Sequence, residues 1–290
     1  MNNKIYLMAA IMAFASVGAL ITQPTIAFAQ SSMIENILNS ALPNNNNNDT
    51  NEESTTSSDT LSLAAPVSTS LSCGQVIKES VKLSANLDCK TDGLIVGSDG
   101  ITIDLNGFTI SGPGVKSSKV GLMLANNDDV QVTGTGTIKG FQAGVLNTGG
   151  SDNKISKVAF TENEIAIFNT GAKNTVIEDN QMISNSIGMA SHSSSGTKLH
   201  GNMLTNNQLA GVTLVNSAGN ELDLNTIRGS VNGVFFDGQS TKNNVNTNTI
   251  VENSGVDINN GNGLPTNINQ NVFTDNLCHT SVPDGLCIGR

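Results

Sequence analysis

The sequence predicts an all-β solenoid, a single-stranded right-handed parallel β-helix of about 22 residues per coil. Apolar residues recur in three columns that share this period, and columns of Asn keep the same phase. The composition agrees, because 290 residues with no Trp, one Tyr and 29 Gly do not resemble an ordinary mixed globular domain. We expect a signal peptide over residues 1–29, a spacer over 30–70 and the β-helix over 71–290.

The N-terminus has the pattern of a cleaved signal peptide. Lys4 precedes an apolar run from Ile5 to Ile21, and the small-residue site Ala27-Phe28-Ala29 follows. A membrane anchor is the alternative, but the run is near the lower limit for a membrane span. We therefore expect export with removal of this segment, and no membrane span in what remains.

Residues 30–70 are expected to be a disordered Asn/Ser/Thr-rich spacer. The segment contains an unbroken Asn run from Asn44 to Asn48 and then a Ser/Thr-rich stretch. It has too little apolar surface to offset the entropy lost on ordering. A short helix at 33–42 is the one regular element expected here.

The first apolar column and the polar column beside it define the repeat. The apolar residues are spaced 22, 22, 22, 23, 23 and 23 apart: Ile138, Phe160, Met182, Leu204, Ile227, Ile250 and Phe273. Two residues before the later members stand Asn180, Asn202, Asn225, Asn248 and Asn271. A second polar column contains Asn163, Asn185, Asn207, Ser230, Asn253 and Asn276.

Two further apolar columns keep the same phase. One, usually preceded by Gly, contains Val145, Ile167, Met189, Val212, Val234 and Val256. The other contains Ile155, Ile177, Leu199, Leu222, Val245 and Ile268. One coil cannot bury its own inward side chains, so neighbouring coils must stack with strands about 4.8 Å apart. The Asn columns are expected to be structural, with Asn and Gly supplying left-handed backbone at the bends.

The four cysteines, Cys73, Cys89, Cys278 and Cys287, are predicted to form disulfides in an oxidising compartment. Three pairings are open, and the local one is the most economical because the two pairs sit at opposite ends of the folded region. In that pairing each bond ties one cap of the solenoid. Zinc is the rival interpretation, but neither pair has C-x-x-C spacing.

The opening coils resemble a known group. The segments Cys73-Gly74, Leu83-Ser84-Ala85-Asn86-Leu87-Asp88-Cys89 and 101–112 resemble secreted right-handed β-helix repeat proteins of the pectin-lyase-like superfamily. The repeat after residue 150 is similar to generic β-helix repeats and to NosD-like proteins. The resemblance covers residues 71–290 and implies the fold. It does not imply one activity, because the superfamily includes lyases, polygalacturonases, epimerases, tailspikes and adhesins.

Strand alternation predicts one charged outer face. Glu178, His200 and Asp223 should stack on successive coils, with Lys198 and Glu221 beside them. As a polysaccharide site, this face would place two carboxylates about 9.5 Å apart, with Lys198 or His200 as a base. The alternative is a solvated sheet face on which opposite charges pair.

A second outer face should carry Leu146, Phe168, Ala190, Thr213, Phe235 and Asp257. Phe168 and Phe235 are candidate ligand-binding residues, because exposed aromatic rings stack on sugars and apolar patches mark contact surfaces. The loop at 113–119 or the N-terminal spacer are alternative covers for this face.

No metal site or cofactor is expected. His192, His200 and His279 fall at unrelated positions, and the oxygen-rich turn from Asn126 to Asp129 is a weak calcium candidate. The net charge of −10 argues against a nucleic-acid partner.

Two functions remain open. The first is a non-catalytic secreted or cell-surface protein that binds glycan or a partner protein. The second is a polysaccharide lyase or glycoside hydrolase that uses the charged face.

Overall fold

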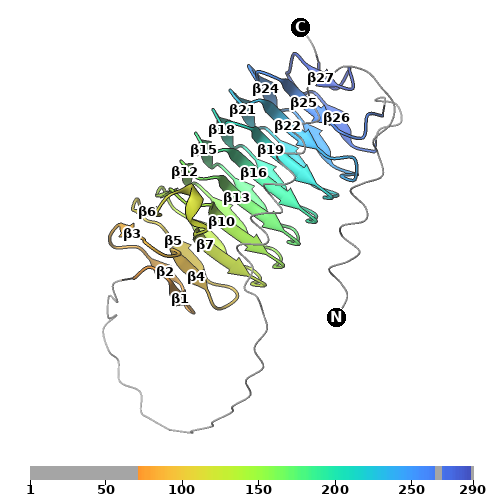
Figure 1. Cartoon of the computed structure of the whole chain (residues 1–290). Coiled ribbons are helices and arrows are strands. Elements are labelled where there is room, and N and C mark those ends of the chain that lie inside the picture. Colours follow the sequence, from red (N-terminus) through yellow and green to blue (C-terminus); the bar gives the residue numbers. More distant parts are fainter. Residues whose placement is uncertain (1–70, 265–269, 289–290) are drawn as a thin grey trace, which may run out of the picture.

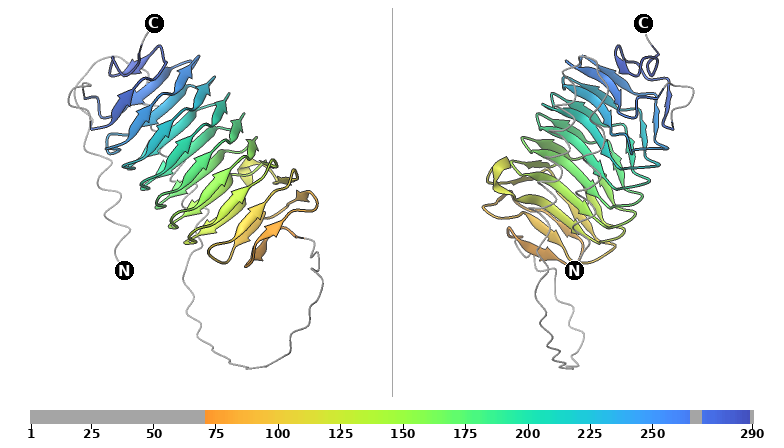
Figure 2. Two further views of the ribbon diagram at one scale, coloured as in Figure 1. Left: turned by 180° about the vertical axis from the view of Figure 1, so that it is seen from behind. Right: turned by 45° about the vertical axis from the view of Figure 1, so that its right-hand side comes forward.

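A computed structural model describes residues 71–264 and 270–288, which form a parallel β-helix of about nine coils (Figures 1 and 2). Three parallel sheets, named A, B and C here, run along the solenoid. The predicted signal peptide, the spacer and Ile268 lie outside the described residues. The described part contains no helix long and apolar enough to cross a membrane. The predicted fold class is confirmed.

Every strand hydrogen-bonds to the equivalent strands of the neighbouring coils. Sheet A contains, in spatial order, β1 (Gln75–Ile77), β4 (Leu94–Val96), β7 (Val120–Ala125), β10 (Ala143–Thr148), β13 (Ile165–Thr170), β16 (Ile187–His192), β19 (Ala210–Val215), β22 (Asn232–Phe236), β25 (Val256–Asn260) and β27 (Ser281–Val282). Sheet B contains β2 (Val81–Lys82), β5 (Thr102–Asp104), β8 (Gln131–Thr133), β11 (Lys154–Ser156), β14 (Val176–Glu178), β17 (Lys198–His200), β20 (Glu221–Asp223), β23 (Asn244–Asn246) and β26 (Val272–Thr274). Sheet C contains β3 (Leu87–Asp88), β6 (Thr109–Ser111), β9 (Thr137–Lys139), β12 (Ala159–Thr161), β15 (Gln181–Ile183), β18 (Met203–Thr205), β21 (Thr226–Arg228) and β24 (Thr249–Val251). A short 3-10 helix, η1 (Val115–Ser117), interrupts the third coil.

The apolar columns line the interior, as predicted. In sheet C, Phe160 pairs with Met182 and Met182 with Leu204, and all three side chains are buried. Full burial of an aliphatic or aromatic side chain contributes roughly 1.5–3 kcal/mol. Because one such residue comes from each strand of each coil, the core is a continuous column and not a set of separate clusters.

Stacked asparagines join the coils at the bend between sheets B and C. The side-chain amide of Asn180 donates to Asn202 Oδ1 at 3.0 Å, and that of Asn202 donates to Asn225 Oδ1 at 3.1 Å. Asn202 Nδ2 also donates to the Ile177 carbonyl oxygen at 2.8 Å, and the Asn180 backbone N–H donates to Asn202 Oδ1 at 2.9 Å. Each amide therefore satisfies backbone groups that a bend would otherwise leave buried and unpaired.

The asparagines of the ladder do not adopt the left-handed backbone conformation that we predicted for them. Among the buried ladder members, Asn180 and Asn202 have ordinary backbone, and the residues just before them, Asp179 and Gly201, have φ of 54° and 65°. Because the ladder needs an amide side chain pointing inward, the positive φ falls on the outward neighbour. Short polar residues and Gly accept that conformation at low cost.

The glycines that precede the sheet A column serve close packing and not positive φ. A Cβ placed on Gly188 would lie 2.6 Å from the Gly211 carbonyl oxygen and 2.8 Å from Leu204 Cδ2. Real Cβ atoms do not approach other atoms this closely, so the neighbouring coil excludes any side chain here.

The last two coils depart from the predicted register. Val234 pairs with Ile258 and not Val256, and Phe235 pairs with Asn259 and not Asp257. Gly233 on β22 lies opposite Asp257 on β25 and faces its carbonyl oxygen. Asp257 therefore occupies the position that Gly holds in earlier coils.

A five-residue shift follows in the next turn. Val245 pairs with Phe273, and Asn243 and Asn248 donate to Asn271 and Asn276, each 28 residues further on. Phe273 therefore belongs to sheet B, Asn271 continues the ladder of Asn243, and Asn276 continues that of Asn248. Additional residues between β25 and β26 lengthen this coil, which a constant spacing of 23 residues does not anticipate.

Both disulfides form in the local pairing. Cys73–Cys89 closes the N-terminal coil and Cys278–Cys287 the C-terminal one. At the C-terminal end the buried Asp257 also accepts hydrogen bonds from the backbone N–H groups of His279 and Thr280, at 2.9 and 3.1 Å. These contacts secure the terminal coil, whose outer strand edge lacks a further coil to pair with.

The asparagine ladder makes a stability prediction. Asn202→Ala should lower the free energy of unfolding by about 1–3 kcal/mol, because buried backbone groups of two coils lose their partners. The matched control Asn244→Ala removes an exposed amide on β23 and should change stability by less than about 0.5 kcal/mol. Urea denaturation followed by far-UV circular dichroism measures both. Equal losses would show that the ladder does not hold the coils together.

Candidate functional site

The predicted charged face exists on the outer side of sheet B. Glu178 pairs in register with His200, and His200 with Asp223. Lys198 pairs with Glu221 two residues earlier on the same strands, and therefore on the same face. Lys154, on β11, completes the group. We call these six residues the sheet B wall. The sequence correctly predicted that five of these residues share one face, because side chains alternate regularly along the strands of these coils.

One ion pair and one hydrogen bond link neighbouring strands of the wall. Lys154 Nζ lies 2.6 Å from Glu178 Oε1, and His200 Nδ1 lies 2.8 Å from Asp223 Oδ2. The His200 side chain is 47% exposed and the Asp223 side chain 24% exposed. The wall is thus an open, flat surface on which opposite charges alternate along the solenoid axis.

The contact with Asp223 orients the His200 ring. Because a carboxylate accepts a hydrogen bond, it favours the tautomer that carries a proton on Nδ1. Nε2 is then free to accept a proton or a hydrogen bond from a bound molecule. Glu178 and Asp223 are two strands apart, about 9.5 Å at the backbone.

The second predicted face is buried, which changes the role of its aromatic residues. Phe168 and Phe235 do point outward from sheet A, but Phe168 is 0% exposed and Phe235 is 7% exposed. Neither ring is free to stack on a sugar in this structure, so the predicted exposed platform is absent. Asp257, expected on the same face, is buried in the C-terminal cap instead.

We call the buried patch on this face the outer strip. It comprises, outside the main core, the residues Val120, Ala143, Leu146, Ile165, Phe168, Ile187, Ala190 and Val215. Sequence reasoning found its position, because alternation sets the side a residue faces. It did not find its burial, because the register alone does not show what lies on a face.

The oxygen-rich turn from Asn126 to Asp129 uses its side chains within the fold. Asp128 Oδ1 accepts hydrogen bonds from the Ser151 backbone N–H and hydroxyl, both at 2.8 Å. Asn127 Oδ1 accepts from the Ala125 N–H at 3.0 Å. The two bonds from Ser151 join the turn to the next coil, and they lower the pKa of Asp128 below its ordinary value of 3.8.

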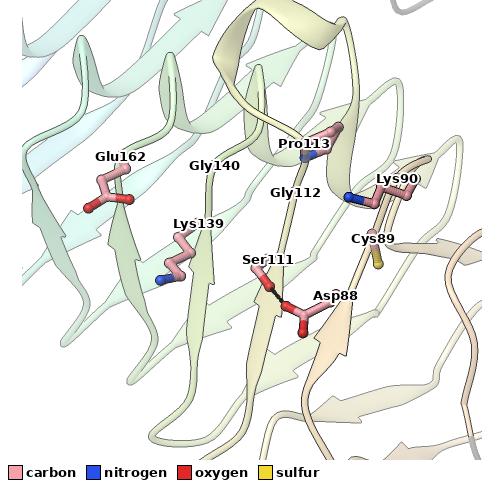
Figure 3. Close-up of a pocket in the computed structure, with 9 residues that line it drawn as sticks. All are labelled: Asp88, Cys89, Lys90, Ser111, Gly112, Pro113, Lys139, Gly140 and Glu162. Carbon is pink, nitrogen blue, oxygen red and sulfur yellow. Dashed lines mark hydrogen bonds between the residues drawn. The ribbon is translucent and has the colours of Figure 1, made fainter.

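A polar hollow of about 530 Å³ lies on the outer side of sheet C (Figure 3). Asp88, Ser111 and Lys139 line it from consecutive strands, and Glu162 follows the next strand. The Ser111 hydroxyl donates to the Asp88 carboxylate. The loop that leads to η1 borders one side through Gly112 and Pro113. The hollow therefore gathers two carboxylates and two lysines, Lys90 and Lys139, around a concave surface.

Sequence reasoning missed the hollow, although a signal was present. Extending the column of Ile138 backwards reaches Ile110 and Leu87, with spacings of 28 and 23 residues. Asp88, Ser111 and Lys139 are the residues just after these three. The longer spacing reflects the inserted loop around η1, which hides the phase of the early coils.

The fold and the charged wall define the chain as a parallel β-helix protein of a disulfide-forming compartment. Residues 85–284 match the family model described as NosD, periplasmic copper-binding protein. The match covers more than two thirds of the chain, and the chain belongs to the NosD family. The periplasmic description and the two disulfides agree on a location outside the cytoplasm. No curated protein sequence matches the chain.

Several solved structures are similar in chain path. The enzymatically active domain of bacteriophage CBA120 tailspike protein 2 is 14% identical, with a TM-score of 0.48, over 74% of this chain and 38% of that one. DFA-IIIase from Arthrobacter chlorophenolicus A6 is 10% identical, with a TM-score of 0.49, over 69% and 57%. The periplasmic alginate epimerase AlgG is 11% identical, with a TM-score of 0.40, over 68% and 61%. The chain thus spans between 38% and 61% of the length of these proteins.

The copper in the family description has no matching ligand set among the described residues. Copper favours imidazole, thiolate and thioether ligands. Every described cysteine is in a disulfide, and the described residues include no group of three or more His, Cys, Asp or Glu side chains placed to hold a metal. His192 and His200 lie on different sheets, and His200 Nδ1 is already bonded to Asp223. The described coils therefore offer no cluster of imidazole, thiolate and carboxylate ligands for copper.

Burial of the outer strip predicts a structural role for Phe168. Phe168→Ala should lower the free energy of unfolding by about 3–5 kcal/mol, because it opens a cavity in a dry cluster. The control Val272→Ala, which shortens a 53%-exposed side chain, should have a much smaller effect. Chemical denaturation measures both. A Phe168→Ala effect as small as the control would show that the ring is open to solvent.

The hydrogen bonds of Asp128 predict a pH-dependent contribution to stability. Because its folded-state pKa is lowered, the carboxylate stabilises the fold above about pH 3.8, and this contribution disappears as the pH falls through the folded-state pKa. Asp128→Asn should therefore be less stable than wild type at neutral pH, and the gap should close in acid. Asp129→Asn removes the same charge next to these bonds and should show no such convergence. Thermal melts across roughly pH 2–7 measure the difference.

Proposed function

We propose that this chain is an exported, non-catalytic protein, secreted or held at the cell surface, whose sheet B wall binds glycan. The single observation that supports this is the exposed row of alternating charges from Lys154 through Glu178 and His200 to Asp223. The row crosses four neighbouring strands, so its groups recur at intervals of about 4.8 Å.

The chemistry of the row suits a hydroxyl-rich polymer. Carboxylates accept hydrogen bonds from neighbouring hydroxyls, and Lys and His side chains donate to ring or carboxylate oxygens. Bonds to charged groups contribute about 1.5–3 kcal/mol each, more than neutral ones. A linear glycan lying along the solenoid axis would meet a donor or an acceptor at every coil.

The openness of the wall favours binding over turnover. Catalytic groups act most strongly in sites from which water is excluded. The His200 side chain is 47% exposed, and Glu178 is held by Lys154. The hollow, which offers more enclosure, lies on sheet C and not on this wall.

One observation favours the alternative of a polysaccharide lyase or glycoside hydrolase. Asp223 holds Nδ1 of His200 at 2.8 Å, which leaves Nε2 placed to act as a base. The backbone separation of Glu178 and Asp223, about 9.5 Å, is near the upper end of the range for inverting glycosidases. Lys198 and Glu221 lie beside this pair and would orient the substrate.

Binding is tested with the full exported chain and a panel of immobilised uronic-acid and neutral polysaccharides. The double variant Glu178→Gln/Asp223→Asn should weaken binding at least about tenfold, because two charged acceptors become neutral ones of similar shape. The control Lys139→Ala/Glu162→Gln alters the hollow on sheet C and should bind like wild type.

The outcomes separate the surfaces and the two functions. Binding that the hollow variant loses and the wall variant retains would overturn the assignment to sheet B. Release of shortened or unsaturated products by wild type, abolished in both His200→Ala and Asp223→Ala, would overturn the non-catalytic function and establish the enzyme.

A further inference from the structure

The outer strip is a dry apolar surface on the outside of the solenoid. Phe168, Ile187 and Ala190 are 0% exposed and Leu146 is 2% exposed. Leu146, Phe168 and Ala190 point away from the core, because the residues just before them, Val145, Ile167 and Met189, point into it. Ile187 belongs to the same outer cluster. A parallel sheet that is dry on both faces is normally covered by other elements on both of them. This outward face is as dry as the interior.

The described residues around the strip do not account for its dryness. Its apolar contacts among them are within sheet A and with the partly buried Met123 and Leu209, at the strip's ends and edges. Neighbours on the same sheet can shield only the flanks of an outward side chain, yet Phe168 is 0% exposed. The low solvent exposure extends to Glu164, the residue just before β13. Burial raises the pKa of its carboxyl group, while a hydrogen bond with Gln142 lowers it. A further layer must therefore cover the strip.

We propose that residues 33–42 of this same chain form an amphipathic helix that docks on the outer strip. The segment alternates pairs of apolar and polar residues, Met33-Ile34, Glu35-Asn36, Ile37-Leu38, Asn39-Ser40 and Ala41-Leu42. Apolar residues at these intervals fall on one side of a helix with 3.6 residues per turn. This inference is independent of the glycan-binding proposal, because it concerns a different sheet.

The flanking residues contain start and stop signals for such a helix. Ser32 and Glu35 have the spacing of a capping box, in which the Ser side chain and the Glu side chain satisfy the first free backbone N–H groups. Pro43 follows Leu42 directly, and Pro disfavours the helical conformation in the residue before it. The sequence therefore limits the helix to the ten residues that carry the apolar side.

The dimensions of helix and strip agree. Ten helical residues rise about 15 Å. The strip runs from Val120 on β7 to Val215 on β19, four strand spacings of about 4.8 Å or roughly 19 Å, so the helix would cover most of its length. Residues 43–70 connect the helix to the first coil, and 28 residues span far more than the five spacings, about 24 Å, from β1 to β16.

Because residues 33–42 are covalently connected to the solenoid, they are favoured over a second copy of the chain as the cover of the strip. A segment joined covalently to the solenoid through 28 residues meets the strip at an effective concentration near the millimolar range. An isolated helix of ten residues is unstable in water, and docking on an apolar face is what stabilises it. Its own chain therefore occupies the strip ahead of a second copy.

Hydrogen–deuterium exchange on the full exported chain tests the proposal. In wild type, backbone amides of residues 33–42 should exchange at least about tenfold more slowly than those of 44–60, at every protein concentration. Exchange as fast as in 44–60 would overturn the proposal without any variant. Protection that disappears on dilution, together with a dimer in sedimentation, would also overturn it, because the cover would then be a second copy.

A matched pair of variants identifies the apolar side. Ile34→Asp/Leu38→Asp places two charges on it and should abolish protection of 33–42 and increase binding of a hydrophobic dye. Asn36→Asp/Asn39→Asp adds the same charge to the polar side and should behave like wild type. Should the first variant remain protected and bind no dye, the helix does not cover the strip by this side.

Discussion

The structure depends on one constraint, which is that every coil must place the same kind of side chain at the same position as the coils above and below it. Parallel strands pair only with equivalent strands of adjacent coils, so each coil's backbone hydrogen bonds belong to its neighbours. The inward columns and the asparagine ladders are two forms of this requirement. In the first, apolar side chains exclude water; in the second, amides such as Asn202 complete the bonding of three successive coils.

Much of this was predictable, because the constraint leaves a mark at every period. The positions of Ile155, Ile177 and Leu199 set the register of sheet B, and with it the meeting of Glu178, His200 and Asp223. The pairing of each cysteine with its nearest partner was also predicted, since the two pairs lie at opposite ends of the repeat.

The errors fall where the period alone does not determine the structure. The shift that places Phe273 in sheet B comes from an insertion, whose length no column records. The hollow around Asp88 lies in the early coils, where the inserted loop near η1 lengthens the spacing between equivalent residues and hides the repeat. Phe168 was placed on the correct side of its strand, but its burial depends on what covers the sheet. Alternation determines direction, and solvent exposure is a property of the whole fold.

The two outer faces differ in what they require of a partner. The sheet B wall carries charged side chains, of which Glu178 and Asp223 are held by Lys154 and His200, so a ligand must offer hydrogen bonds that compensate for the water it displaces. The side chains of the outer strip on sheet A form no hydrogen bonds with a partner, so a partner gains free energy there only by removing apolar surface from water. Because the sheets are joined by bends of a few residues, such opposite surfaces coexist on one narrow rod.

The constancy of the middle coils has a consequence for how such a chain changes length. From β11 to β21 successive coils have 22 or 23 residues, and each presents its neighbours with the same set of positions. Duplication or loss of a complete coil therefore leaves matching surfaces on both sides of the junction. Loss of a single residue turns every following side chain of that strand to the opposite face. Genes for such proteins can thus grow or shrink by whole units while the ends stay closed.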